Sequence, residues 1–283
     1  MKTLLVTGGT GFLGQSLLRL AQGWTLHATF CETVPPSHSE VTFHRCDLRV
    51  KSEVKQLIHT SQPDVIIHTA CSNRGSHGLE AIHSAGENLA QESKAGNIPL
   101  IHLSTDMVFD GTLSPYSEDA SPKPLTAYGS IKAKTENTIQ SLAPHSLIIR
   151  TSLLYGVHPN DHVTNWLLDS IQQGKSLHLF TDEIRCPIWV DNLSAALLEL
   201  ADSPQNGILH IAGPVALSRW DWGQMMLKVF HMENHPFIVP GTIHETGMVR
   251  PTNLTMNIHK AQQVLQTALS APGDVLGRLL SDR

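Results

Sequence analysis

This chain of 283 residues has few cysteines and lacks any run of basic residues. The four cysteines, Cys31, Cys46, Cys71 and Cys186, form no Cys-x-x-Cys pair, which is typical of a reducing compartment and not of a disulfide-stabilised secreted protein. The 20 basic and 25 acidic residues give a net charge of −5 without a basic run. We therefore expect no binding to nucleic acid or to an anionic membrane.

Long hydrophobic runs are also missing from the sequence. No run approaches the roughly 18 apolar residues of a membrane-spanning helix. The apolar start of the chain stops at Thr7, where glycines follow, so we expect no secretory signal. The hydrophobic content of 41% is typical of a globular protein with a large core. These features favour a cytoplasmic protein that acts on a small molecule.

Short β-branched runs alternate with helix-period stretches over the first 150 residues. Strands are predicted at 3–7, 25–30, 41–46, 65–69, 100–104 and 146–150, and helices at 12–22, 50–60, 79–95 and 127–142. Apolar strands that alternate with helices form a parallel sheet covered on both faces. The predicted fold class is therefore α/β, with a doubly wound parallel sheet of the Rossmann type.

The pattern loosens after residue 150 and indicates a smaller C-terminal lobe. Helices are predicted at 163–173, 192–201 and 218–230, short strands at 177–180 and 208–211, and one or two amphipathic helices within 258–280. We predict an NAD(P)-binding domain at 1–154 plus about 182–205, and a substrate-binding lobe at about 155–181 and 206–283. The lobe is expected to cover the carboxyl ends of the strands, where ligands of open α/β sheets bind.

A glycine-rich loop follows the first predicted strand and opens the first predicted helix. Its glycines fit TGxxGxxG from Thr7 to Gly14, and from Gly9 onward they also fit GxGxxG. Glycine lets the backbone approach a pyrophosphate, which then lies at the positive end of the helix. The expected cofactor contacts in this loop are Gly8, Gly11, Phe12, Leu13 and Gly14.

The residue that separates NAD from NADP is expected after the second strand. Glu32 stands near that place and favours the ribose hydroxyls of NAD, although it could equally be a solvated loop charge. Arg45 or Arg49 could reach the same pocket and accept the 2′-phosphate of NADP, so both cofactors stay open. Further expected cofactor contacts are Asp47, Leu48, Ala70 and Cys71.

Tyr128 and Lys132 are four residues apart at the start of a predicted helix, so both side chains emerge on one face. An adjacent ammonium favours the ionised phenol and lowers its pKa, which suits proton transfer. The preceding strand ends at Ser104 and Thr105, whose hydroxyls could hold a substrate carbonyl. A packed tyrosine beside a solvated lysine is the alternative interpretation.

Several motifs resemble the extended short-chain dehydrogenase/reductase superfamily, and most closely the dTDP-4-dehydrorhamnose reductase family. Residues 104–111, STDMVFDG, are similar to the STDYVFDG of that family, and residues 150–156, RTSLLYG, are similar to R-[TS]-SWLYG. Residues 182–187 resemble DQxGxP, and residues 250–253 resemble RPxN. The resemblance extends in order from the first strand to about residue 257.

The resemblance implies a reductase in which NAD(P)H delivers a hydride to the 4-keto group of a nucleotide-linked deoxysugar. It implies that Tyr128 donates the proton, that Lys132 lowers the pKa of Tyr128 and orients the nicotinamide ribose, and that Thr105 holds the carbonyl. Tyr128 and Lys132 thus also count as cofactor contacts. The expected substrate contacts are Ser104, Asp106, Met107, Leu153, Arg185 and Arg250.

The departures from the family pattern lie mainly at substrate positions. Met107 replaces a tyrosine, Leu153 a tryptophan and Arg185 a glycine. Arg185 and Arg250 are candidates to bind a diphosphate, although either could form a structural salt bridge. Ser16 replaces a glutamate that some relatives use in a metal-bridged dimer. A homodimer stays possible on other grounds than this residue.

Two other functions remain open. Met107 and Leu153 favour a dinucleotide-binding regulatory subunit without turnover. An epimerase or dehydratase with tightly held NAD would use the same site, with Asp106 beside Thr105. We expect no metal site, because the i, i+4 pair His231 and His235 has no third ligand.

Overall fold

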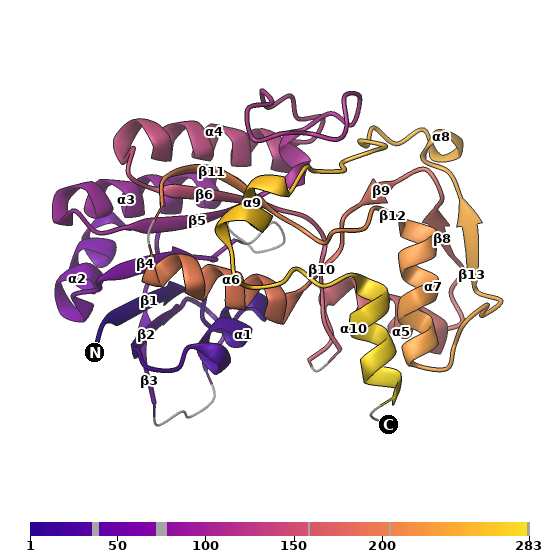
Figure 1. Cartoon of the computed structure of the whole chain (residues 1–283), viewed down its shortest axis with the longest axis horizontal. Coiled ribbons are helices and arrows are strands. Elements are labelled where there is room, and N and C mark those ends of the chain that lie inside the picture. Colours follow the sequence, from indigo (N-terminus) through magenta and orange to yellow (C-terminus); the bar gives the residue numbers. More distant parts are fainter. Residues whose placement is uncertain (36–39, 72–77, 158, 204, 282–283) are drawn as a thin grey trace.

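The computed structural model describes residues 1–35, 40–71, 78–157, 159–203 and 205–281. A seven-stranded parallel sheet forms its centre (Figure 1). Across the sheet the strands are β11 (Gly207–Ile211), β6 (Leu147–Thr151), β5 (Leu100–Thr105), β4 (Val65–His68), β1 (Thr3–Thr7), β2 (Thr25–Phe30) and β3 (Val41–Arg45). This order confirms the predicted doubly wound sheet of the Rossmann type.

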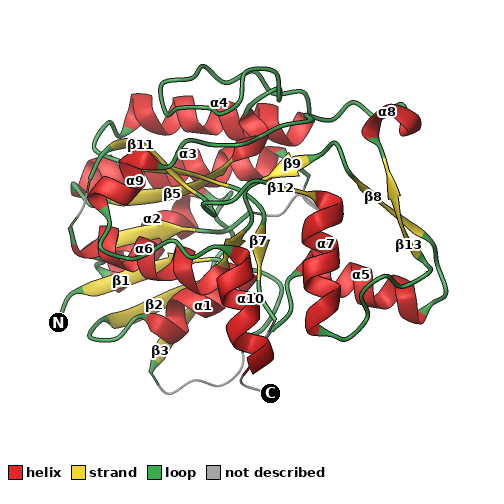
Figure 2. Cartoon of the chain, turned by 45° about the vertical axis from the view of Figure 1, so that its right-hand side comes forward, coloured by secondary structure: helices red, strands yellow, loops and turns green. Residues whose placement is uncertain are grey.

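Helices cover both faces of the sheet (Figure 2). One face is covered by α1 (Phe12–Leu20), α6 (Val190–Asp202) and α9 (His259–Val264), and the other by α2 (Lys51–Ser61), α3 (Glu80–Gly96) and α4 (Ala127–Leu142). Side chains alternate along each strand, so Leu4 and Val6 of β1 pack with Leu17 of α1, whereas Leu5 packs with Leu89 of α3. β1 is therefore apolar on both faces, as its sequence predicted.

The seventh strand comes from a part of the chain that the sequence analysis assigned to the second lobe. β11 pairs in parallel with β6, and Ile208 lies opposite Ile148. The helix α6 precedes β11 and supplies the long crossover that a parallel pair needs. The lobe boundary predicted near residue 206 is therefore not where the central sheet ends, and the rest of the predicted domain division stays a prediction.

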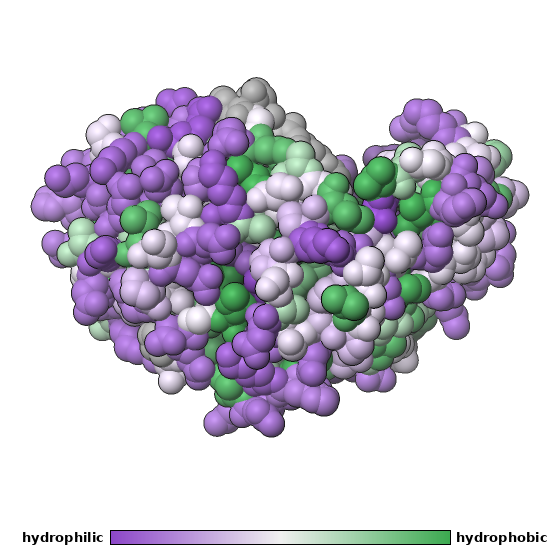
Figure 3. All heavy atoms as spheres, turned by 90° about the horizontal axis from the view of Figure 1, so that it is seen from above, coloured by the Kyte–Doolittle hydropathy of each residue, from purple (hydrophilic) through white to green (hydrophobic). Residues whose placement is uncertain are grey.

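The smaller lobe has its own apolar core, built around Trp222, Met226 and Leu227 of α7. Its elements are α5 (His162–Gln172), β8 (Leu177–Phe180), β12 (Leu217–Ser218), α7 (Arg219–Val229), β13 (Ile238–Gly241), α8 (Ile243–Thr246) and α10 (Pro272–Ser281). Short strands β7 (Leu154–Tyr155), β9 (Ile184–Arg185) and β10 (Ile188–Trp189) lie in the chain that joins the two parts. A hollow bordered by apolar side chains separates this lobe from the main body (Figure 3).

Two further features concern expectations from the sequence. Among the described residues, no helix is both long and apolar enough to cross a membrane. The helix α7 ends at Val229, so His231 and His235 do not share a helix face. Throughout the residues that the structure describes, no group of three or more His, Cys, Asp or Glu side chains could hold a metal ion.

Candidate active site

The glycine loop between β1 and α1 is a tight turn in which side chains would clash with the neighbouring backbone. Gly8 has φ +75, and a Cβ there would lie 2.8 Å from Cα of Ala70. A Cβ on Gly14 would lie 2.2 Å from the carbonyl oxygen of Gly8, so this position tolerates only glycine. Gly11 is the N-cap of α1 and gives no side-chain cap, which leaves the first amides of the helix open to an anion.

A cavity of about 440 Å³ lies in front of this loop at the carboxyl ends of β1, β2, β3 and β4. Seven predicted cofactor residues line it: Gly8, Gly11, Glu32, Asp47, Leu48, Ala70 and Cys71. The side chain of Leu13 packs into the core under the sheet, and the ring of Phe12 lies against Gly156. Sequence analysis placed Phe12 and Leu13 at the cofactor, and their side chains are turned elsewhere, which leaves main-chain contact as their expected contribution.

Charges of both signs line the cavity near the carboxyl ends of β2 and β3. Arg49 binds the carboxylate of Asp47, with Nε 2.8 Å from Oδ1, and both residues line the cavity together with Glu32. Of the two arginines considered from the sequence, Arg49 is the one among the lining residues. The ion pair with Asp47 holds the pKa of Arg49 above its usual value, so the guanidinium stays charged.

The first turn of α4 places Tyr128. Thr126 caps the helix by accepting a hydrogen bond from the amide of Gly129 at 3.1 Å. A Cβ on Gly129 would lie 2.1 Å from the carbonyl oxygen of Met107, so the glycine permits close packing of α4 on the short 3₁₀ helix η1 (Asp106–Val108). The phenol oxygen of Tyr128 then lies 3.8 Å from Sγ of Cys71, at the border of the cavity.

The electrostatics of Tyr128 and Lys132 differ from the expectation. Burial is the largest influence on the phenol and raises the pKa of Tyr128, and the neighbouring Cys71 raises it further. Lys132 is buried, and its ammonium donates to the carbonyl of Leu103 and to Nε2 of His102 at 3.4 Å. Burial also lowers the pKa of Lys132. The ammonium is thus held by β5, and the expected lowering of the Tyr128 pKa is not met in this structure.

Ser104 and Thr105 at the end of β5, which the sequence analysis placed together at the substrate, bind different parts of the protein. Thr105 caps η1 by accepting from the amide of Met107 at 3.2 Å, and its hydroxyl donates to Asp106 at the same distance. Ser104 is buried and donates to Glu136 of α4. Because successive side chains point to opposite faces of a strand, Ser104 faces the helix layer, and its role as a substrate contact stays a prediction.

Asp106 is fully buried, and both of its carboxylate oxygens accept hydrogen bonds. Arg185 binds both oxygens, with Nε 2.7 Å from Oδ2 and Nη2 2.5 Å from Oδ1, and Ser152 donates to Oδ2 at 2.6 Å. The remaining nitrogen of Arg185 lies 3.5 Å from the sulfur of Met107. Asp106 is thus bound within the protein by Arg185, 79 residues away, and its role as a substrate contact stays a prediction.

Three arginines surround one buried carboxylate at the base of the smaller lobe. Glu183 binds Arg250 at 2.7 Å, and it pairs with Arg185 at 3.6 Å and with Arg219 at 4.0 Å. We call Glu183 and these three residues the arginine cluster. Burial lowers the pKa of Arg219 to about 10, so it is charged at neutral pH. Sequence analysis missed Arg219, which lies in no recognised motif and carries no local signal except its place beside the N-cap Ser218.

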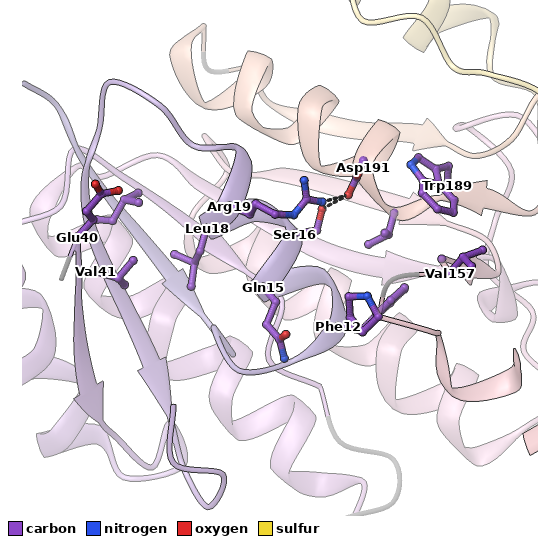
Figure 4. A pocket seen from close by; sticks show the side chains of 14 residues that line it. Phe12, Gln15, Ser16, Leu18, Arg19, Glu40, Val41, Val157, Trp189 and Asp191 are labelled. Atoms are coloured by element: carbon purple, nitrogen blue, oxygen red, sulfur yellow. Dashed lines mark hydrogen bonds and ion pairs between the residues drawn. The ribbon is translucent and has the colours of Figure 1, made fainter. Parts of the chain in front are cut away.

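Leu153, another predicted substrate contact, is partly buried and packs against the apolar core of the smaller lobe. A second cavity, of about 480 Å³, lies beside α1 and is lined by Phe12, Trp189 and Val157 among others (Figure 4). Ser16 points to Asp191 there and donates to it at 2.6 Å, and Arg19 binds the same carboxylate. The family glutamate at position 16 is thus replaced by a hydroxyl bound within the chain.

The chain resembles known reductases over most of its length. The probable low-salt glycan biosynthesis reductase of Haloferax volcanii is 31% identical over 241 residues, which cover 79% of each chain. The dTDP-4-dehydrorhamnose reductase of Aggregatibacter actinomycetemcomitans is 28% identical over 289 residues and 93% of each chain. Methionine adenosyltransferase 2 subunit beta of Xenopus tropicalis is 28% identical over 278 residues, covering 92% of this chain and 81% of that protein.

A solved structure shows the same fold. The dTDP-4-dehydrorhamnose reductase of Bacillus anthracis, solved in complex with NADP, superposes with a TM-score of 0.82 at 21% identity and covers 100% of both chains. The family described as RmlD substrate binding domain matches residues 1–282. The resemblance found in the sequence is confirmed, and the chain belongs to the RmlD substrate binding domain family.

Proposed function

We propose that the chain is an NAD(P)H-dependent reductase of a 4-keto group on a nucleotide-linked deoxysugar, or of a related carbonyl compound, with Tyr128 as proton donor. The observation that carries the proposal is the phenol oxygen of Tyr128, 3.8 Å from Sγ of Cys71. Cys71 lines the cavity in front of the glycine loop, so the phenol borders the space proposed for the cofactor. Membership of a reductase family supports the same assignment.

The cavity in front of the glycine loop fits a dinucleotide of the NAD(P) type. Gly8 and Gly14 leave space that a Cβ would fill, and the open amides of α1 suit a pyrophosphate. Glu32 suits the ribose hydroxyls of NAD, whereas Arg49 suits the 2′-phosphate of NADP. Both cofactors are therefore part of the proposal.

The chemistry assigned to the protein is alignment and proton transfer, and the bound nicotinamide supplies the hydride. Thr105 holds the substrate oxygen, which replaces the 3.2 Å hydrogen bond from its hydroxyl to Asp106. Tyr128 then gives its proton to that oxygen as negative charge develops there. Burial raises the pKa of Tyr128 and so keeps the phenol protonated, as a proton donor requires. Lys132 orients the cofactor ribose.

The arginine cluster supports an anionic substrate such as a nucleotide diphosphate. Asp106 accepts hydrogen bonds from two nitrogens of Arg185. We therefore assign Arg185 to the internal ion pair and not to the substrate diphosphate. Arg250 uses one nitrogen for Glu183 and keeps 45% of its side chain exposed. Arg250 and Arg219 are therefore the arginines we assign to the substrate diphosphate.

The first test is a titration with NADH and NADPH, followed by absorbance at the nicotinamide band while nucleotide-linked 4-keto sugars are added. The proposal predicts cofactor binding and oxidation of the reduced cofactor by at least one sugar. Stoichiometric reduced sugar would accompany it, as the hydride and proton balance requires. Tight cofactor binding with no oxidation across the panel would contradict the reductase assignment.

Replacing Arg250 with methionine is expected to weaken inhibition by dTDP roughly 10-fold or more, because hydrogen bonds to charged groups contribute about 1.5–3 kcal/mol. The measurement is the inhibition constant of dTDP against the reductase reaction. Arg219→Met should have a comparable effect. Arg278→Met, which removes a cation of α10 outside the cluster, is the control. Equal inhibition constants for all four proteins would remove the cluster from the substrate site.

A regulatory subunit without turnover is the second candidate function. Relatives named methionine adenosyltransferase 2 subunit beta cover most of this chain, and Met107 and Leu153 replace two aromatic residues of the reductase pattern. This function predicts cofactor binding without oxidation, together with a stable protein complex in a pull-down. A dehydratase would need an acid beside Thr105, and Asp106 is already bound by Arg185 and Ser152.

A further inference from the structure

Four buried polar side chains form a line through the interior from β1 to α4. Oγ1 of Thr7 lies 2.7 Å from Nδ1 of His68, and the rings of His68 and His102 are 5.0 Å apart between their centroids. Nε2 of His102 lies 3.4 Å from Nζ of Lys132. All four residues are at most 2% exposed. The proposed reaction uses Lys132 and gives no role to the two histidines.

The hydrogen bonds of Lys132 restrict where its ammonium can point. An ammonium has three N–H donors and no acceptor. The carbonyl of Leu103 takes one donor, and Nε2 of His102 takes a second. Both acceptors belong to β5, so one N–H is left for the cavity side, where Cys71 and Tyr128 lie.

His102 can accept this hydrogen bond only as a neutral imidazole. Burial and the positive charge of Lys132 hold the pKa of His102 well below its usual value, so it remains neutral at physiological pH. Its proton then lies on Nδ1, which finds no partner among the described residues. Burial also lowers the pKa of His68, to about 3, so no second charge faces the lysine from β4.

The other groups that face Lys132 do not replace this contact. Glu136, one turn further along α4, favours the charged ammonium but is hydrogen-bonded to Arg150 and Ser104. Cys71 also favours it from the end of β4. The imidazole of His102 is thus the one side chain within hydrogen-bonding distance of the ammonium among the described residues.

We propose that His102 is a positioning residue for Lys132: its Nε2 lone pair fixes the ammonium and directs the remaining N–H toward the Tyr128 side of the cavity. The inference rests on the proposed function, because it assigns His102 a role in placing a group of that same site. Loss of the acceptor would leave a buried N–H without a partner, which disfavours the charged form of the lysine. The lysine would then titrate at lower pH and lose its fixed direction.

Two substitutions of nearly equal size test the proposal. In His102→Gln the side-chain amide reaches the place of Nε2, whereas in His102→Asn it reaches only the place of Nδ1. The pKa of Lys132 is followed by NMR of ¹³Cε-labelled lysine and assigned with Lys132→Arg, a readout that needs no turnover. We expect the asparagine variant to lower this pKa by about one unit or more, and the glutamine variant to stay within a few tenths.

Kinetics supply the second readout. We expect kcat of His102→Asn to fall roughly 10-fold to 100-fold, as loss of alignment does, with KM for the sugar little changed and His102→Gln near wild type. His68→Asn is the matched control, since His68 is as buried as His102 but bonds Thr7 instead of the lysine. It should not move the pKa of Lys132.

Equal behaviour of the asparagine and glutamine variants, with both folded and both binding cofactor, would overturn the proposal. A loss of thermal stability in the asparagine variant with an unchanged lysine titration would leave His102 with packing alone, and would overturn it too. If the two variants differ in the pKa of Lys132 but the wild-type protein shows no turnover, the result would contradict the proposed function and not the placement of Lys132. The two failures are therefore distinguishable.

Discussion

Replacing Tyr128 with phenylalanine is expected to lower kcat by about 10²-fold to 10⁴-fold, the range that a positioned proton donor contributes. Phenylalanine keeps the ring beside Cys71 and removes only the hydroxyl that lies 3.8 Å from Sγ. Cofactor binding should change little, because no charge is lost. Single-turnover absorbance at the nicotinamide band measures the chemical step, and a fluorescence titration measures cofactor affinity.

Tyr155→Phe is the matched control for this substitution. Its hydroxyl is buried and finds no hydrogen-bond partner among the described residues, and its ring packs against Trp189 in the smaller lobe. Its removal should leave kcat near wild type. Equal rates for wild type and Tyr128→Phe would assign the proton to another donor, and equal losses in both tyrosine variants would indicate a general structural effect.

The pH dependence follows from the raised pKa of Tyr128. Burial raises this pKa, so the phenol is protonated throughout the neutral range. Reduction, which needs the protonated form, should therefore be insensitive to this group at neutral pH and should decline only when alkaline pH removes the proton. Oxidation of the product alcohol needs the phenolate and should rise with pH. A reduction rate that falls between pH 6 and 8 through this group would contradict the assignment.

Short sequence motifs and hydrophobic periodicity predicted those elements of the fold that depend on neighbouring residues in the chain. The glycine loop lies between β1 and α1, and Tyr128 opens α4, as their spacing indicated. Two-residue strands such as β7 and β9 carry no periodicity, and the turn-rich stretch 236–251 contains β13 and α8, which the sequence analysis did not predict. The place of β11 in the sheet was also missed, because pairing with β6 is a long-range contact.

The hydrogen-bond partners of the site residues are long-range contacts as well. Ser104 and Asp106 belong to a motif of the family, but their roles here depend on partners far along the chain. Glu136 accepts a hydrogen bond from Ser104. Arg185 of β9 neutralises the charge of Asp106. A family motif identifies which residues gather at a strand end. It does not tell which of them face a ligand and which are bound within the protein.

Replacing Arg150 with methionine is expected to lower the free energy of unfolding by about 3–5 kcal/mol, because it leaves a buried charge without its partner. Nη2 of Arg150 lies 2.8 Å from Oε2 of Glu136, and the two side chains are 2% and 1% exposed. The guanidinium also lies 5.1 Å from the centroid of the buried Phe109 ring. Urea unfolding measures the loss, and the exposed pair of Lys134 and Glu80, where Lys134→Met should cost under about 1 kcal/mol, is the control.

The double variant Arg150→Met with Glu136→Leu separates the cost of the unpaired charge from the worth of the ion pair. Removal of both charges should recover most of the loss, because apolar residues of similar volume often replace a buried pair without cost. Ser104 would then lack its acceptor, so recovery should stay incomplete by about 1 kcal/mol. A double variant as unstable as Arg150→Met would show instead that the arginine stabilises the protein through Phe109 and packing, since the carboxylate would no longer be present to explain the loss.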